Sequence, residues 1–246
     1  MNYSFHNKVV WVTGASKGIG LSLANELHQL GAQLVLSARD SSKIKGIPSA
    51  TLIDCDVTDK AQVTQVVATI IEKFGGLDCI ILNAGNAEYV DVAKFDSDIY
   101  RRMMEVNFMS QVEAVEICLP HLRKSPAPYI VGMTSSVAWL GLSRGHAYSA
   151  SKAAARNFFQ GLALDLVNDD IPVSIICPGF VKTPLTDKND FPMPGLITAE
   201  SAGQRIANGL VKMKPEIHFP KRFTWPLKFI SCLPAGIRFW LLKKVV

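Results

Sequence analysis

Short apolar runs alternate along the chain with longer stretches in which apolar side chains recur every three or four positions. The short runs predict buried strands, and the longer stretches, such as the one marked by Leu23, Leu27 and Leu30, predict helices with one packed face. The predicted strands are residues 8–12, 33–38, 51–54, 79–82, 129–133 and 216–219, and the predicted helices include residues 63–74, 99–119 and 199–213. This alternation favours one α/β domain with a mostly parallel sheet.

One polar residue interrupts the apolar pattern of the predicted helix at residues 99–119. Asn107 stands among Met103, Val106 and Phe108, so its side chain is expected to be buried. A buried amide without hydrogen-bond partners is costly, and we therefore expect Asn107 to be bonded. The pattern leaves open whether this residue is a structural contact or part of a catalytic proton relay.

Composition narrows the class of protein. The chain has 246 residues, which suits one large domain. It has no basic, apolar leader at residues 1–12 and no apolar run of the ~18 residues that a membrane span requires, so we expect a cytoplasmic protein. The five cysteines are scattered without metal-ligand or redox-motif spacing. We expect buried free thiols and no bound metal.

The positive charge is concentrated in the C-terminal tail. Residues 217–246 contain six Lys or Arg and no Asp or Glu, while the whole chain has a net charge of +5. Trp and Leu are interspersed with these cations, and Pro226 and Pro234 divide the tail into pieces too short to cross a bilayer. This composition is typical of a helix at a membrane surface; a cap on the substrate site and a dimer contact are the alternatives. Nucleic acid is not an expected partner, because no recognition module surrounds the basic residues.

A glycine-rich turn follows the first predicted strand and leads into a helix. Residues 13–20 read TGASKGIG, and such a turn lets the backbone and the helix N-terminus approach a pyrophosphate. The second strand ends at Arg39, where an acidic residue would bind a ribose 2′-hydroxyl and an arginine accommodates a 2′-phosphate. Lys17 in the turn could reach the same phosphate. The two cations favour NADP over NAD; the alternative is a pair of ordinary solvated charges.

Tyr148 and Lys152 lie four residues apart in a predicted helix, so their side chains share one face. A phenol titrates near pH ~10, too high for ready proton exchange at neutral pH, and a nearby ammonium lowers its pKa. Tyr148 would then be a usable general acid and base. The same spacing also occurs in solvated pairs, so the pair alone does not establish catalysis.

Ligands of doubly wound sheets bind at the carboxyl ends of the strands, where Gly14, Arg39, Asp56, Asn83 and Ser136 all follow predicted strands. With these residues in place, the chain resembles the short-chain dehydrogenase/reductase family over residues 8–185. The motifs that carry the resemblance are Thr13 to Gly20, Asp56, Asn83-Ala84-Gly85, Asn107, Ser136, Tyr148-x-x-x-Lys152 and Pro178-Gly179-x-Val181-x-Thr183.

The resemblance implies a doubly wound Rossmann fold and residue roles. Tyr148 would be the general acid or base, Ser136 would bind the substrate oxygen, and Lys152 would bind the nicotinamide ribose and lower the tyrosine pKa. Asn107 would hold a water that connects the lysine to solvent. Together with Lys17 and Arg39, the implied cofactor-binding residues are Gly14, Ser16, Gly18, Ile19, Gly20, Asp56, Val57, Asn83, Ala84, Gly85, Tyr148, Lys152, Pro178, Gly179, Val181 and Thr183.

Two features depart from the family pattern. Ser136 lies twelve residues before Tyr148, which is one fewer than the commonest spacing, so Ser135 remains a candidate for the catalytic serine. We prefer Ser136 because it precedes Val137-Ala138 as the family serine usually does. The glycine-rich last strand that the family uses in tetramer packing is also absent, and the basic tail stands in its place.

The predicted substrate site has two walls. Residues 184–194 are polar and proline-bearing, which predicts a mobile lid, and residues 139–146 would form the opposite wall, with His146 as a wall residue rather than a catalyst. Core packing explains each apolar side chain in or next to these segments equally well, but as a group these side chains favour an apolar substrate. They are Trp139, Leu140, Leu142, Phe180, Leu185 and Phe191.

We therefore expect an NADP(H)-dependent ketone or aldehyde reductase, or a secondary alcohol dehydrogenase, that assembles as a dimer or tetramer. Residues 1–222 would form the catalytic domain, with a lid at about 180–200, and residues 223–246 an amphipathic extension with membrane-surface contact. One alternative is a nucleotide-binding sensor or scaffold that keeps this fold without catalysis. Another is a membrane-surface protein that acts on lipid-derived substrates.

Overall fold

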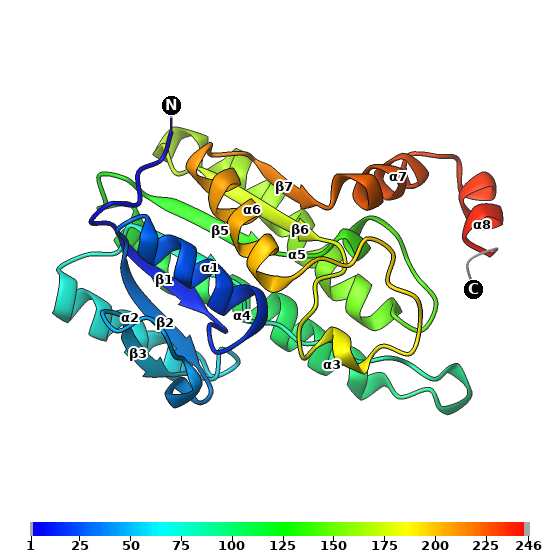
Figure 1. The fold of residues 1–246 in the computed structure, drawn as a ribbon, viewed down its shortest axis with the longest axis horizontal. Helices are drawn as coiled ribbons and strands as arrows, with labels where there is room; N and C mark the ends of the chain where they lie inside the picture. Colours follow the sequence, from blue (N-terminus) through cyan, green and yellow to red (C-terminus); the bar gives the residue numbers. More distant parts are fainter. Residues whose placement is uncertain (1, 244–246) are drawn as a thin grey trace.

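A twisted sheet of parallel strands forms the centre of the computed structural model, which describes residues 2–243 (Figure 1). The seven strands of this region lie in the order β3-β2-β1-β4-β5-β6-β7. The order reverses between β1 and β4, which is the switch point where such sheets bind ligands. The strands are β1 Val9–Thr13, β2 Gln33–Ala38, β3 Thr51–Asp54, β4 Cys79–Leu82, β5 Tyr129–Met133, β6 Val173–Pro178 and β7 Glu216–Phe219.

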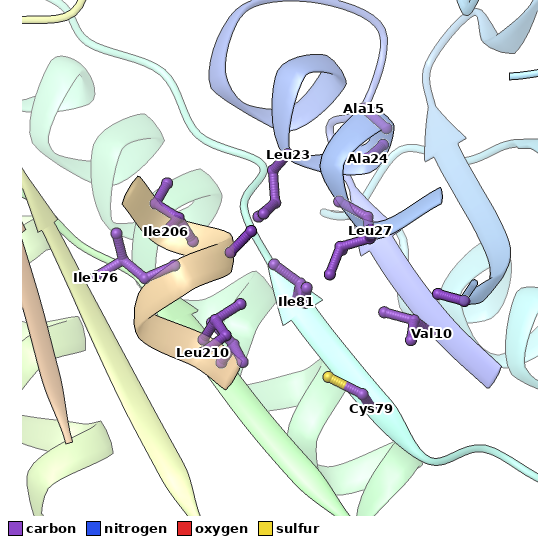
Figure 2. Close-up of a cluster of buried hydrophobic side chains, with 14 of the residues drawn as sticks. Val10, Ala15, Leu23, Ala24, Leu27, Cys79, Ile81, Ile176, Ile206 and Leu210 are labelled. Atoms are coloured by element: carbon purple, nitrogen blue, oxygen red, sulfur yellow. The ribbon is translucent and has the colours of Figure 1, made fainter. Parts of the chain in front are cut away.

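Helices cover both faces of the sheet, which confirms the predicted doubly wound α/β domain. Helices α1 (Gly18–Gln29) and α6 (Ala199–Val211) cover one face, where Leu23, Ile206 and Leu210 pack with Ile81 of β4 (Figure 2). Helices α2 (Lys60–Phe74), α4 (Ser110–Leu122) and α5 (His146–Asp165) cover the other with a second apolar cluster. Because most strands are buried on both faces, they appear in the sequence as continuous apolar runs.

The helix predicted at residues 99–119 consists of three segments. Helix α3 (Ser97–Met104) runs into a π-helix, η3 (Glu105–Met109), and continues as α4. The connection between β2 and β3 is too short for a full crossover helix and holds only the 3-10 helix η1 (Ser41–Lys43). The other 3-10 helices are η2 Val92–Lys94, η4 Ser136–Trp139, η5 Val167–Asp169 and η6 Thr186–Lys188.

A glycine in β5 allows helix α5 to pack directly on the sheet. A Cβ at residue 132 would lie only 2.1 Å from Cε2 of Phe159, whose ring is fully buried. The aromatic ring thus fills the space that any other side chain at position 132 would need. This contact fixes α5, and with it Tyr148 and Lys152, against the strand that ends beside the site.

Two helices follow the sheet, α7 (Lys221–Ser231) and α8 (Ala235–Lys243), and the predicted boundary at residue 222 falls inside α7. Helix α7 is held to β7, because Lys228 forms an ion pair with Glu216 and Thr224 Oγ1 lies 2.7 Å from Nδ1 of His218. Helix α8 has no buried residue and extends beyond the end of α7 (Figure 1). Within residues 2–243, every helix is too short or too polar to cross a bilayer.

The cysteines differ from expectation at one position. Cys55, Cys79, Cys118 and Cys177 are buried free thiols as predicted, but Cys232, at the end of α7, is exposed. The prediction of buried thiols is therefore wrong for Cys232, because α7 presents that position to solvent rather than to the core.

Candidate active site

A cavity of about 600 Å³ opens where the strands end, and its lining comes from segments far apart in the sequence. The residues predicted to bind a cofactor all line this cavity: Gly14, Ser16, Lys17, Gly18, Ile19, Gly20, Arg39, Asp56, Val57, Asn83, Ala84, Gly85, Tyr148, Lys152, Pro178, Gly179, Val181 and Thr183. Its volume lies within the range of about 300–1,000 Å³ typical of ligand sites. The fold thus gathers the predicted residues in one place.

The glycine turn is shaped by backbone geometry that side chains rarely tolerate. Gly14 and Gly18 have φ values of +65° and +58°, in the left-handed region that favours glycine. A Cβ at residue 14 would also lie 2.8 Å from the Cα of Ala84. Asn83 donates its side-chain amide to the carbonyls of Thr13 (2.9 Å) and Gly14 (3.1 Å). The Asn83 side chain therefore supports the turn in addition to lining the cavity.

The cations at the cavity suit a ligand with phosphate groups. Lys17 and Arg39 are both exposed and line the cavity. The neighbouring acid, Asp40, pairs with Lys43 at 2.8 Å and accepts from Ser42 Oγ at 2.6 Å. Since its carboxylate has these local partners, the charge at the end of β2 is set by the arginine. The glycine turn and the two cations could therefore face the phosphate groups of one ligand.

Lys152 is buried on α5 with its ammonium directed at the end of β5. Its Nζ donates to the carbonyl of Met133 at 3.0 Å and lies 6.0 Å from the centre of the Tyr148 ring. Burial lowers the pKa of Lys152 to about 8. A Cβ at residue 85 would lie 3.2 Å from this Nζ and 2.8 Å from Oδ1 of Asn107, so Gly85 gives both groups room.

Tyr148 differs from the expectation drawn from the Tyr–Lys spacing. Burial raises the pKa of the Tyr148 phenol, and a hydrogen bond with the Ser135 side chain opposes that increase. The predicted lowering of the pKa by Lys152 is not seen in this structure, because the lysine hydrogen-bonds to Met133 and burial dominates at the phenol. A phenol with a raised pKa holds its proton at neutral pH and is available as a donor.

The structure places Ser135, rather than Ser136, beside the tyrosine. Ser135 lines the cavity and ends the extended segment before η4, whereas Ser136 begins η4, is buried and is not part of the cavity lining. This placement favours Ser135, one residue before the sequence-based choice of Ser136. The twelve-residue separation was the signal that pointed to it, since Ser135 restores the commoner spacing to Tyr148.

Asn107 is fully buried in the π-helix with several side-chain partners. Its Nδ2 donates to the Asn86 carbonyl at 2.9 Å and to Ser151 Oγ at 3.0 Å, and its Oδ1 accepts from the Asn86 N–H at 2.9 Å. Its own carbonyl accepts from Gln111 Nε2 at 2.6 Å. These contacts join the π-helix to α5 and to the loop after β4, and they support the structural role of the two that the sequence left open.

The predicted lid lines part of the cavity and is tied to the loop after β4 and to the predicted opposite wall. Arg144 forms a two-pronged ion pair with Asp190, at 2.9 and 3.0 Å, and the Tyr89 hydroxyl donates to Asn189 at 2.5 Å. Lid residues that the sequence reasoning missed also line the cavity, among them Thr186 and Lys188. The lid sequence has no periodic pattern, so the positions of these residues could be learned only from the three-dimensional structure.

The predicted apolar wall is only partly realised. Of its residues, Leu185 lines the cavity, whereas Trp139 packs against His218 with ring centres 5.7 Å apart. Phe180 contacts Phe191 of the predicted lid, with ring centres 6.0 Å apart, and Leu140 is buried. His146 bonds to Tyr100 through Nδ1 at 2.7 Å and does not line the cavity. Of the six predicted wall residues, only Leu185 therefore lines the cavity.

Known proteins resemble the chain in sequence and in fold. Residues 8–192 match the family model described as short chain dehydrogenase. An uncharacterized oxidoreductase of Myxococcus xanthus is 29% identical over 91% of each chain. A short chain dehydrogenase from Burkholderia cenocepacia, solved in complex with NADP, has a TM-score of 0.86 at 23% identity, covering 98% of this chain and 99% of that one. A relative from Burkholderia phymatum, solved with NAD, has a TM-score of 0.84 at 21% identity, with 92% and 93% covered.

Proposed function

This chain belongs to the short-chain dehydrogenase/reductase family and is an oxidoreductase, and from that premise we propose that it uses NADP(H) to interconvert a carbonyl and an alcohol. The observation that carries the proposal is the meeting of Ser135, Tyr148 and Lys152 with the glycine turn and Arg39 in one cavity. The physical arrangement matches a reaction in which a proton donor and a bound dinucleotide act on the same substrate.

Different residues of the cavity would bind different parts of the cofactor. The glycine turn and the start of α1 would hold the pyrophosphate, because free N–H groups and the helix dipole favour anions there. Lys17 and Arg39 would bind the 2′-phosphate, and Lys152 the ribose next to the nicotinamide. When bound, the cofactor supplies or accepts the hydride.

The chain's own residues would handle the proton and the developing charge. Tyr148 Oη would donate its proton to the carbonyl oxygen during reduction and accept one from the alcohol during oxidation. Ser135 Oγ would donate a second hydrogen bond to the same oxygen and orient it. Buried Lys152 would supply positive charge near the phenol. In a partly buried site such preorganised donors stabilise developing negative charge more strongly than water does.

A titration with both cofactors tests the cofactor assignment. We expect NADPH to bind more tightly than NADH, followed by nicotinamide fluorescence. Arg39→Ala should weaken NADPH binding by about 10- to 100-fold and leave NADH binding unchanged, because one charge-assisted contact to the 2′-phosphate is lost. Arg205→Ala is the matched control, since Arg205 is exposed on α6 away from the cavity. Equal affinity of the wild-type protein for the two cofactors would contradict the assignment.

The variant Tyr148→Phe distinguishes the proposed enzyme from the alternative, a non-catalytic nucleotide-binding sensor. This variant removes one hydroxyl and should keep NADPH binding, while carbonyl-dependent NADPH oxidation falls by about 10²- to 10⁴-fold as expected for the loss of a general acid. Tight NADPH binding with no turnover of any carbonyl by the wild-type protein would favour the sensor. The apolar character of the substrate and the dimeric or tetrameric assembly stay predictions.

A further inference from the structure

The C-terminal helices expose large apolar side chains at high density. Among residues 2–243, thirteen large apolar side chains are exposed, and five of them come from α7 and α8. These five, which we call the tail face, are exposed by 51–71%. Trp225 and Phe229 lie four residues apart on α7, and Ile237 and Trp240 lie three apart on α8, so each pair shares one side of its helix. Apolar side chains exposed together in this way mark a contact surface. The tail face consists of Trp225, Phe229, Ile237, Phe239 and Trp240.

The C-terminal tail, residues 217–246, is strongly positive. It contains six Lys or Arg and no Asp or Glu, so it carries +6 while the rest of the chain carries −1, although one of its cations, Lys228, is paired with Glu216 of β7. Arg238, in α8, lies beside the exposed Ile237 and Phe239 in sequence. A partner of the tail face must therefore tolerate or attract several positive charges at once.

We propose that α7 and α8 dock on the surface of an anionic lipid membrane. Helices that combine aromatic side chains with Lys and Arg lie in the headgroup region, where the rings enter the apolar boundary and the cations meet anionic lipids. A second copy of the tail fits less well, because two such surfaces would bring like charges together. The helices lie on the membrane without crossing it, since every helix in residues 2–243 is too short or too polar to span.

The attachment of α7 makes the tail face part of the folded domain. Phe223 in its first turn packs on Phe180, with ring centres 5.3 Å apart, and a Cβ at residue 179 would lie 2.8 Å from the Phe223 ring. Lys228 and Glu216 hold the other end of the helix to β7. Docking through α7 would therefore orient the whole domain on the membrane rather than tether it by a loose chain.

Sedimentation of the full-length protein with vesicles tests this proposal without any substrate or cofactor. We expect pelleting with phosphatidylcholine vesicles that contain about one third phosphatidylserine, weaker pelleting with phosphatidylcholine alone, and loss of pelleting at about 0.5 M salt, where surface charges are screened. The double variant Phe229→Ser/Phe239→Ser should bind the anionic vesicles at least about tenfold more weakly, because it removes two exposed rings.

A matched control uses exposed apolar residues outside the tail. Val92→Ser/Leu164→Ser changes side chains that are 70% and 76% exposed, and it should pellet like the wild-type protein. An unchanged urea unfolding midpoint shows that the tail variant is folded. Absence of pelleting by the wild-type protein, or equal pelleting by the tail variant, overturns the proposal. A dimer that becomes monomeric in the tail variant, without vesicle binding, would identify the tail face as a contact between copies instead.

Discussion

At the scale of single residues, neighbouring serines show where sequence reasoning stops. Ser135 and Ser136 are chemically identical, and the sequence offers only their spacing from Tyr148 and the residues that follow them. The backbone decides between them, because Ser135 has an extended conformation with φ −163° and caps η4, while Ser136 turns inward as its first residue. A sequence motif indicates that a serine follows the strand, but which of two adjacent serines faces the cavity depends on the backbone conformation of the turn.

Paired substitutions of these serines test the register. Ser135→Ala should lower kcat/KM by about 10²- to 10³-fold, because it removes a hydrogen bond to the developing oxyanion. Ser136→Ala should stay within a few-fold of the wild-type value. Initial rates of NADPH oxidation with one accepted carbonyl substrate measure both. The reverse pattern, with the larger loss in Ser136→Ala, would restore the sequence-based choice.

At the scale of elements, the predicted strands match the structure closely and the helices less so. The bounds of β2, β3, β4, β5 and β7 were predicted as the structure has them. Strands β4 and β5 are buried on both faces and leave continuous apolar runs, whereas β3 lies at the edge of the sheet and alternates half-buried and exposed residues. The π-helix Glu105–Met109 was missed, because one widened turn leaves the apolar spacing of a long helix almost unchanged. Asn107, a polar residue in an apolar pattern, marked this region as unusual, but the sequence did not indicate the π-helical backbone.

The contact between β5 and α5 predicts that two glycine-to-alanine substitutions change the stability of the protein in opposite directions. Gly132→Ala should lower the free energy of unfolding by about 1–3 kcal/mol or more, because its Cβ would overlap the fully buried Phe159 ring. Gly161→Ala, on the exposed side of α5, meets no described atom within 4 Å and should raise it by about 0.5–1 kcal/mol through helix propensity. Urea denaturation of both variants measures the difference. A neutral Gly132→Ala would show that the ring moves freely.

The contact between β7 and α7 should depend on pH. Burial, together with Lys228 and Lys221, lowers the pKa of His218 to about 4, so the imidazole is neutral in the folded protein. Lys221 Nζ lies 2.8 Å from its Nε2 and fits an acceptor there, which only the neutral ring provides. Because the folded pKa lies below the unfolded value near 6.5, this stabilisation is complete above about pH 6.5 and is lost as pH falls toward about 4.

Denaturation at a series of pH values measures that dependence. The wild-type free energy of unfolding should fall between about pH 6.5 and 4, and His218→Asn should show a shallower fall because the titrating ring is gone. Carboxylates also titrate in this window, so the quantity that matters is the difference between the two slopes. Identical slopes would mean that His218 does not contribute to the acid sensitivity.

At the scale of the whole molecule, the site arises from topology. All strands run parallel, so their carboxyl ends meet at one edge and bring Gly14, Arg39 and Tyr148 together although they lie far apart in the sequence. The doubly wound order could be predicted for this reason. The lid contacts, such as Arg144 with Asp190, could not, because long-range ion pairs between irregular segments leave no local pattern.

The exposed thiol of Cys232 gives the tail a natural attachment point for a reporter. Four of the five cysteines are buried, and burial raises the pKa of Cys55 to about 11 and of Cys177 to about 12, so these two remain as unreactive thiols at neutral pH. A maleimide dye should therefore couple selectively at the end of α7 in the native protein. An environment-sensitive fluorophore there would report the polarity around the tail during vesicle titrations, with no engineered cysteine.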